Sequence, residues 1–204
     1  MSSLTLVTAP AVEPCSTADA KAFCRVDTST DDGYIASLIT AARRAVESYT
    51  GRALCTQTWD AQFDEIPGDV IYLPMPPLIS VTSIKFTNSD GTEGSAIAST
   101  VYTVDVGRAP GRVIRNQGQS WGYTGLRSFL GTKVRFVAGY GATAADVTAV
   151  SPVVGSVPSD LVLAVKRIVL HNYENRDDVA VGTIAAKIPN DAILLMDPYR
   201  LINL

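Results

Sequence analysis

The stretch from residue 31 to residue 52, DDGYIASLITAARRAVESYTGR, contains the clearest secondary-structure signal of the chain. Its apolar residues recur at the spacing of one helix face: Ile35, Leu38, Ile39, Ala42, Val46 and Tyr49. Acceptors and negative charge at Thr30, Asp31 and Asp32 suit the positive end of a helix. Gly51 stands where a left-handed cap residue is expected. The stretch therefore predicts an amphipathic helix that ends at Gly51.

The residues before this helix predict an extended arm and a second, shorter helix. Pro10 and Pro14 are incompatible with a helix, so the segment through Pro14 is expected to be extended. Ser16 is a good N-cap, and Asp19 follows three residues later, as in a capping box with a shorter acid. A short helix is expected from there to about Arg25.

After the long helix the chain changes to short runs with β character, broken by turn residues. The candidate strands are Thr56–Phe63, Val70–Leu73, Ser80–Thr87, Val101–Val106, Gly111–Arg115 and Thr132–Ala138. Alternation assigns two sets of residues to single strand faces: Tyr102, Val104 and Val106, and Val134, Phe136 and Ala138. This region predicts a small antiparallel sheet inserted between helical halves.

The C-terminal part returns to helical spacing. Residues 141–158 are poor in charge and longer than a usual connection, which predicts a mobile loop or a surface completed by a partner. A third helix is expected to start near Ser159, with its apolar face formed by Leu161, Val162, Val165, Ile168, Val169 and Tyr173. Asp177–Pro189 is expected to be irregular, and a short last helix is expected near Asp191–Leu201.

These patterns predict an α+β fold in which the N- and C-terminal helical parts form one helical body around an inserted small antiparallel β-sheet region. The expected divisions are an arm with helices at 1–54, a β-rich region at 55–140, a flexible loop at 141–158, and C-terminal helices with a tail at 159–204. The two helical parts are expected to pack together as one domain.

Composition excludes several classes of protein. The chain has 204 residues, 47% of them hydrophobic and 18% charged, which fits an ordered globular protein. Its formal net charge of −3 does not favour nucleic acid or an acidic membrane as a partner. No basic region precedes an apolar one at the N-terminus and no apolar run has the length of a membrane span, so neither a secretory signal nor a membrane partner is expected. Cys15, Cys24 and Cys55 form no recognised motif and are expected to be reduced.

We find no pattern that predicts catalysis. His171 is the one histidine, and no Gly-x-Ser-x-Gly elbow or Gly-Lys-[Ser/Thr] phosphate loop is present. A histidine-rich metal site is impossible, and the scattered cysteines make zinc unattractive. We therefore expect no enzyme activity, no catalytic residues, no cofactor and no metal.

One charge pattern is unusual. Six basic residues occur while no acidic residue is found between Asp105 and Asp146: Arg108, Arg112, Arg115, Arg127, Lys133 and Arg135. We call these six residues the basic strip. It could be a solvated sheet face, a contact to acidic groups of neighbouring subunits, or a contact to DNA phosphates.

Several segments, taken in order, resemble the head–tail connector (adaptor) proteins of long-tailed phages and prophages. They are Ala11–Pro14, Cys24–Asp27, Ala42–Arg52, Thr56–Trp59, Leu73–Leu78, Pro110–Arg112, Phe136–Gly141, Val157–Pro158 and Tyr173–Arg176. The resemblance runs through most of the chain, although residues 141–157 depart from the family in length and composition. The family carries no catalytic residues that could be transferred to this sequence.

The resemblance implies a structural virion protein that forms a ring, usually twelve-fold, under the portal. Such a ring extends the DNA channel and offers a docking surface to the next head-completion or tail protein. The implied partners are the portal protein, further copies of the chain, that next protein, and the genomic DNA in the channel. The implied location is the head–tail interface of the virion, and the host bacterial cytoplasm during assembly.

Three alternatives remain open at this point. The first is a tail-completion or tail-terminator subunit. The second is a nucleic-acid-binding protein built on the basic strip, against which the acidic total charge stands. The third is a hydrolase of unknown type, which the absence of a nucleophile motif disfavours.

Overall fold

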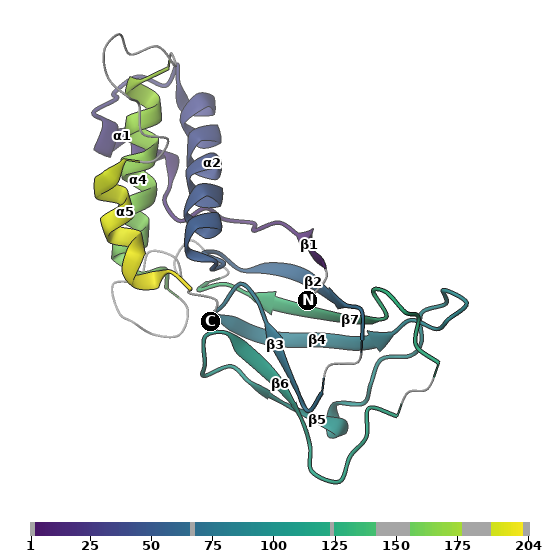
Figure 1. The fold of residues 1–204 in the computed structure, drawn as a ribbon. Coiled ribbons are helices and arrows are strands. Elements are labelled where there is room, and N and C mark those ends of the chain that lie inside the picture. The colour runs from purple at the N-terminus through teal and green to yellow at the C-terminus, as the bar shows by residue number, and fades with distance from the viewer. Residues whose placement is uncertain (1–2, 66–67, 123–124, 142–155, 177–188, 202–204) are drawn as a thin grey trace. The chain divides into compact units, whose positions relative to one another are not determined.

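The structure is a computed structural model that describes residues 3–65, 68–122, 125–141, 156–176 and 189–201. The chain forms two compact units, each described separately below (Figure 1). The sheet unit consists of Met1–Pro10 and Thr56–Gly139, and the helical unit consists of Ala11–Cys55 and Tyr140–Leu204. The mixed α+β class predicted from the sequence is confirmed.

The sheet unit contains two antiparallel sheets rather than the single sheet that was predicted. The four-stranded sheet has the order β1-β2-β7-β4, and the three-stranded sheet has the order β3-β6-β5. The strands are β1 (Ser3–Thr8), β2 (Gln57–Phe63), β3 (Val70–Leu73), β4 (Leu78–Phe86), β5 (Tyr102–Asp105), β6 (Gly111–Arg115) and β7 (Thr132–Ala138). A short 3₁₀ turn, η1 (Ser99–Val101), precedes β5.

Alternation explains how these strands build a core. Val134, Phe136 and Ala138 of β7 are fully buried, as predicted, while the residues between them are partly exposed. Buried side chains from both sheets complete the core of this unit: Ala61, Ile71, Leu73, Leu78, Ile84, Phe86, Val113 and Trp121. The predicted face of Tyr102, Val104 and Val106 is wrong at its end, because β5 stops at Asp105 and Val106 is 49% exposed.

The N-terminal arm is more regular than the sequence indicated. Its residues Ser3–Thr8 form β1, an edge strand that pairs with β2 in antiparallel register, with Leu4 opposite Ala61 and Leu6 opposite Trp59. Most of β1 is exposed. The prediction of an extended conformation is confirmed, but the local pattern did not assign the segment to a sheet.

The helical unit contains α1 (Thr17–Cys24), α2 (Asp32–Thr50), α4 (Ser159–Glu174), α5 (Asn190–Met196) and the 3₁₀ turn η2 (Asp197–Tyr199). Ser16 caps α1 as predicted, since its hydroxyl accepts a hydrogen bond of 3.0 Å from the Asp19 N–H. Gly51 ends α2 with a φ of 70°, in the left-handed region that glycine adopts without strain.

The apolar faces of these helices meet in one core. Helix α4 packs against α2 on one side and α5 on the other, and α1 packs against both α2 and α4 (Figure 1). The buried residues include Ile35, Ile39, Ala42, Val46, Leu161, Val165, Ile168, Val169 and Met196. The periodicity of the sequence thus identified the faces of α2 and α4 correctly.

Two sequence predictions concern residues that the structure does not describe. Most of the loop predicted at 141–158 and most of the irregular stretch Asp177–Pro189 lie outside the described residues. Within the described ranges, no helix combines the length and the apolar character that a membrane crossing requires.

Candidate interaction surfaces

The structure offers no catalytic centre around His171. This residue lies in the last turn of α4, and its backbone carbonyl accepts hydrogen bonds of 3.0 and 2.8 Å from the N–H and the side-chain amide of Asn175. In the described part of the chain, no three His, Cys, Asp or Glu residues come together as metal ligands. His171 therefore has a structural place at the end of α4.

The three cysteines are unpaired, and two of them are inert by environment. Burial raises the pKa of the Cys15 thiol to about 11 and that of the Cys55 thiol to about 12. Cys24 is only partly buried, and desolvation raises the pKa of its thiol as well. Because the thiolate is the reactive species, Cys15 and Cys55 have very little of the reactive form at neutral pH.

The basic strip is divided between the two sheets of the sheet unit. Arg112 and Arg115 lie on β6, and Lys133 and Arg135 lie on β7. Arg108 and Arg127 lie outside the strands, and the guanidinium of Arg127 stacks over the Phe129 ring at 4.3 Å from its centroid. The six residues therefore do not form one face of one sheet.

Four of the six basic side chains find a carboxylate within the chain. Their ion pairs are Arg112–Asp105 at 2.9 Å, Arg115–Asp69 at 2.5 Å, Arg135–Asp60 at 2.8 Å and the short pair Lys133–Glu93. Their acids lie on neighbouring strands or connections, so the gap without acidic residues in the sequence is no gap in space. A role of the basic strip in contacts to DNA or to a neighbouring subunit stays a prediction.

Two of these pairs show pKa shifts that favour the charged form of one partner. The hydrogen bond that Arg112 donates to Asp105 lowers the pKa of Asp105, and the hydrogen bonds that Arg135 donates to Asp60 raise the pKa of Arg135. Asp60 and Arg135 are direct cross-strand partners on β2 and β7, where opposite charges stabilise a sheet.

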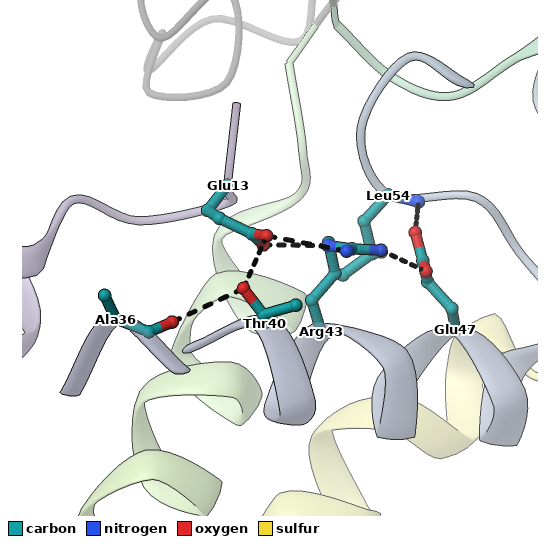
Figure 2. A network of polar contacts seen from close by, with 6 residues as sticks. All are labelled: Glu13, Ala36, Thr40, Arg43, Glu47 and Leu54. Carbon is teal, nitrogen blue, oxygen red and sulfur yellow. Dashed lines mark hydrogen bonds and ion pairs between the residues drawn. The ribbon is translucent and has the colours of Figure 1, made fainter. Parts of the chain in front are cut away.

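A buried ionic network in the helical unit was missed by the sequence analysis (Figure 2). The guanidinium of Arg43 donates to Glu47 at 2.7 Å on one side and to Glu13 at 2.7 Å on the other. Glu13 also accepts a hydrogen bond of 2.9 Å from the hydroxyl of Thr40. The second oxygen of Glu47 accepts a hydrogen bond of 2.9 Å from the Leu54 N–H, so the network ties α2 to the segment before α1 and to the segment that follows α2.

The electrostatics of this network favour the charged form of Arg43. Burial by itself lowers the pKa of Arg43, but the hydrogen bond to Glu13 and the charges of Glu47 and Glu13 outweigh it, so the pKa lies above its ordinary value. The spacing of Arg43 and Glu47, four residues apart on one helix, was the signal available in the sequence.

A second cluster joins the start of α2 to the end of α4. Asp31 occupies the N-cap position of α2, at the helix start that the sequence indicated, but its side chain makes no capping hydrogen bond. Its carboxylate instead accepts hydrogen bonds of 2.7 Å from the Tyr173 hydroxyl and 2.8 Å from Arg176. The Arg176 guanidinium also lies 4.9 Å from the ring centroids of Tyr34 and Tyr173.

A third set of contacts holds the C-terminal segment against the end of α2. Arg52 donates to the carbonyl of Tyr199 at 2.6 Å, and the N–H of Leu201 donates to the carbonyl of Thr50 at 3.0 Å. The hydroxyl of Tyr49 donates to Asp197 at 2.5 Å. Two of the segments that carry the family resemblance, Ala42–Arg52 and Tyr173–Arg176, supply residues to these contacts. Those residues therefore stabilise the helical unit.

Comparison with known proteins gives a match to one family model over part of the chain. Residues 16–105 match the family model described as "Phage gp6-like head-tail connector protein". No curated protein sequence matches the chain.

Solved structures extend the likeness to the whole fold. A chain of "Neck of empty GTA particle computed with C6 symmetry" is 22% identical, with a TM-score of 0.77 over 99% of this chain and 97% of that chain. A chain of "Virion of native gene transfer agent (GTA) particle" is 23% identical, with a TM-score of 0.74 over 98% and 96%. A chain of "Neck of native GTA particle computed with C12 symmetry" is 23% identical, with a TM-score of 0.70 over 99% and 97%.

At these identities the solved structures establish the fold alone, and the family model carries the sequence relationship. The chain therefore matches the phage gp6-like head–tail connector family over residues 16–105, which confirms the resemblance inferred from its motifs.

Proposed function

We propose that this chain is a structural virion protein, a connector subunit that forms a ring under the portal of a phage-like particle. The observation that carries the proposal is the family match over residues 16–105, joined to a fold shared over almost the whole chain with proteins of particle necks. The ring extends the DNA channel and presents the docking surface for the next head-completion or tail protein.

The proposed partners follow from this position. They are the portal protein, further copies of the chain, the next head-completion or tail protein, and genomic DNA passing through the channel. A ring subunit repeats one heterologous contact on both of its sides, and the ring closes when the rotation fits. We propose twelve copies, with the helical unit forming the ring body. The subunit assembles in the host bacterial cytoplasm and acts in the virion.

The proposal assigns no enzyme activity to the chain. The family that residues 16–105 match supports a structural role, and the ionic networks of the helical unit hold segments of the fold together. Stability and complementary surfaces are what a ring subunit requires.

The decisive experiment adds the purified protein to its cognate DNA-filled, tail-less heads and images the portal vertex by cryo-electron microscopy. The expected result is a new ring of density under the portal in which this chain can be traced. A bare portal, with the protein found on tails, would contradict the connector function and establish the alternative, a tail-completion or tail-terminator subunit. A map in which the sheet unit lines the channel would contradict the proposed ring body.

A further inference from the structure

The outer edge of β1 is the most open strand edge of the sheet unit. β1 is the first strand of the four-stranded sheet and pairs with β2 on one side (Figure 1). Among the described residues, no backbone hydrogen bond reaches its other side. In an antiparallel edge strand every second residue directs its N–H and C=O away from the partner strand, so this edge presents a row of donors and acceptors to another strand.

The side chains of β1 do not guard this edge. The sequence from Ser3 to Thr8, SLTLVT, contains no charge and no proline, and its threonine and valine residues favour an extended strand. Leu6 is 38% exposed and Val7 is 42% exposed. The one irregularity is a register shift against β2 between Leu6 and Thr8, near the end of the strand. Proteins usually blunt an open edge with charge, proline or a cover, so an uncharged open edge indicates a place where another strand adds.

The other three sheet edges in the described part of the chain are protected. β4 carries two register shifts along β7, and the segment 94–97 covers its end with backbone hydrogen bonds of 2.8 Å to the carbonyls of Ile84 and Phe86. β3 and β5 have four residues each, and β5 ends in the charged Asp105. Short, bulged, covered or charged edges resist pairing. β1 is therefore the edge that a further strand can join.

We propose that the free subunit pairs with a second copy of itself through β1, with the two strands antiparallel about a two-fold axis. The occupant is a second copy because β1 is itself an open, uncharged strand of the kind that the edge requires. Self-pairing therefore places no like charges opposite one another. The other edges of the molecule are protected, so β1 of one copy meets β1 of the other, and this isologous contact stops at two copies.

The side-chain pattern of β1 selects a register centred on Thr5. Leu4 and Leu6 lie on one face of the strand, and their partners on β2 are Ala61 and Trp59. With Thr5 on the axis, Leu4 of each copy stands opposite Leu6 of the other, so apolar side chains meet on that face. Thr5, which is exposed in the single chain, then stands opposite its own copy.

This pair is distinct from the contact that closes a ring. A ring repeats a heterologous contact, whereas the β1 pair is isologous, so the inference goes beyond the proposed function and describes the subunit before it docks. A pair of six-residue strands buries less than the standard interface of roughly 1,600 Å², so the dimer is weak and forms at high protein concentration. In this state each copy covers the open edge of the other.

Two substitutions at Thr5 test the pair by sedimentation velocity over about 10 µM to 1 mM protein. Thr5→Lys places like charges opposite one another at the axis and should raise the dissociation constant of the dimer roughly fivefold or more. The matched Thr5→Val keeps an uncharged β-branched residue and should dimerise at least as well as the unaltered protein. Because Thr5 is exposed, both variants should fold alike, which circular dichroism checks.

Cysteine cross-linking tests the register. Thr5→Cys is made in a Cys24→Ala background, in which the remaining Cys15 and Cys55 are buried, and is treated with a short bismaleimide. The control Ser95→Cys is exposed and lies beside β4, at the opposite edge of the same sheet. Thr5→Cys alone should give a cross-linked dimer, roughly tenfold above the control and with no larger product, because the pair holds each thiol close to its own copy.

The outcomes separate this inference from the proposed function. A subunit that stays monomeric to about 1 mM, or a dimer that Thr5→Lys leaves unchanged, would overturn the β1 pair, and a ring on DNA-filled heads would still support the connector function. A Thr5-dependent dimer without any ring on heads would support the pair and contradict the connector function. A monomeric subunit whose ring on heads is lost in Thr5→Lys would overturn the pair and assign the β1 edge to a strand of another virion protein.

Discussion

The guanidinium of Arg43 is buried and forms ion pairs with a carboxylate on each of two sides. The Arg43 side chain is 5% exposed and forms ion pairs with Glu13 and Glu47, while the side chain of Glu47 is 7% exposed and also accepts from the Leu54 N–H. A buried pair of this kind adds little net stability over apolar residues, but breaking it leaves an uncompensated charge. We therefore expect position 43 to tolerate few substitutions.

We expect Arg43→Met to lower the free energy of unfolding by about 3–5 kcal/mol, because the carboxylate of Glu47 stays buried without its counter-charge. The neighbouring exposed Arg44→Met should change it by no more than about 0.5 kcal/mol. Urea unfolding followed by circular dichroism measures both. Equal losses in the free energy of unfolding for the two variants would show that burial does not determine how much the network contributes to stability.

The thiols should differ in reactivity in the native protein. With a pKa of about 11 for Cys15 and about 12 for Cys55, the thiolate is scarce at pH 8, and burial also blocks access. Cys24 should therefore react first with iodoacetamide, and all three should react in urea. Peptide mass spectrometry resolves the sites, and early labelling of Cys15 or Cys55 would contradict the buried positions.

At the scale of elements, the start of β6 lies unusually close to the start of β4. A Cβ placed on Gly111 would lie 2.5 Å from the Cβ of Leu78, closer than real side-chain contacts allow. We expect Gly111→Ala to destabilise the sheet unit by about 1–3 kcal/mol, because the added methyl group overpacks the core. Gly107→Ala is the control, since its Cβ would meet only Asp105 at 3.6 Å. Thermal unfolding with equal midpoints for both variants would argue against the close approach.

The pair of β4 and β7 contains a repulsion that Glu93 relieves. Lys85 and Lys133 are direct cross-strand partners, and Glu93 forms an ion pair with both. Hydrogen bonds from Lys133 and then Lys85 lower the pKa of Glu93 below its ordinary value of 4.5. Like charges opposite one another destabilise a sheet, so the carboxylate of Glu93 offsets the repulsion between the two lysines.

The stabilisation by Glu93 should depend on pH. Because the folded pKa is depressed, the contribution is complete above pH 4.5, the unfolded value, and is lost as the pH falls through the folded value. Glu93→Gln should lower the free energy of unfolding at pH 7 by about 0.5 kcal/mol or less, since the pair is solvent-screened, and the difference should vanish at low pH. A difference that stays constant from pH 7 to strong acid would mean that the carboxylate charge is not its cause.

The sequence predicted the strands that are marked by the residues within and beside them. Gly111–Arg115, Val70–Leu73 and Thr132–Ala138 were predicted with the bounds that the structure has, because alternation and turn residues mark them. Long-range partners could not be predicted in the same way. The separation into two sheets depends on which strands pair, and the bonds of Asp31 depend on Tyr173, which is 142 residues away. The strand pairing also decides where the basic strip lies: its members on β6 and β7 belong to two different sheets, which the sequence alone did not show.

At the scale of the whole molecule, the net charge is unequally divided. The sheet unit has seven basic and seven acidic residues, so the chain's −3 belongs to the helical unit, with ten basic and thirteen acidic residues. The basic strip thus lies in a unit that is neutral in total, and four of its members are already paired. Affinity for DNA depends on cations that are free to replace the counterions of phosphates.

We therefore expect the free subunit to bind duplex DNA no more tightly than about 10⁻⁴ M at physiological salt, the weak end of non-specific binding. The matched variant Asp60→Asn, Asp69→Asn and Asp105→Asn removes the partners of Arg135, Arg115 and Arg112 without adding any base. It should bind DNA more tightly and with a steeper salt dependence, because three guanidinium groups become available to phosphates. Fluorescence anisotropy over a salt series measures both proteins. Tight, strongly salt-dependent binding by the unaltered chain would show instead that the paired arginines exchange their carboxylates for phosphate, and would make the basic strip a DNA contact of the channel.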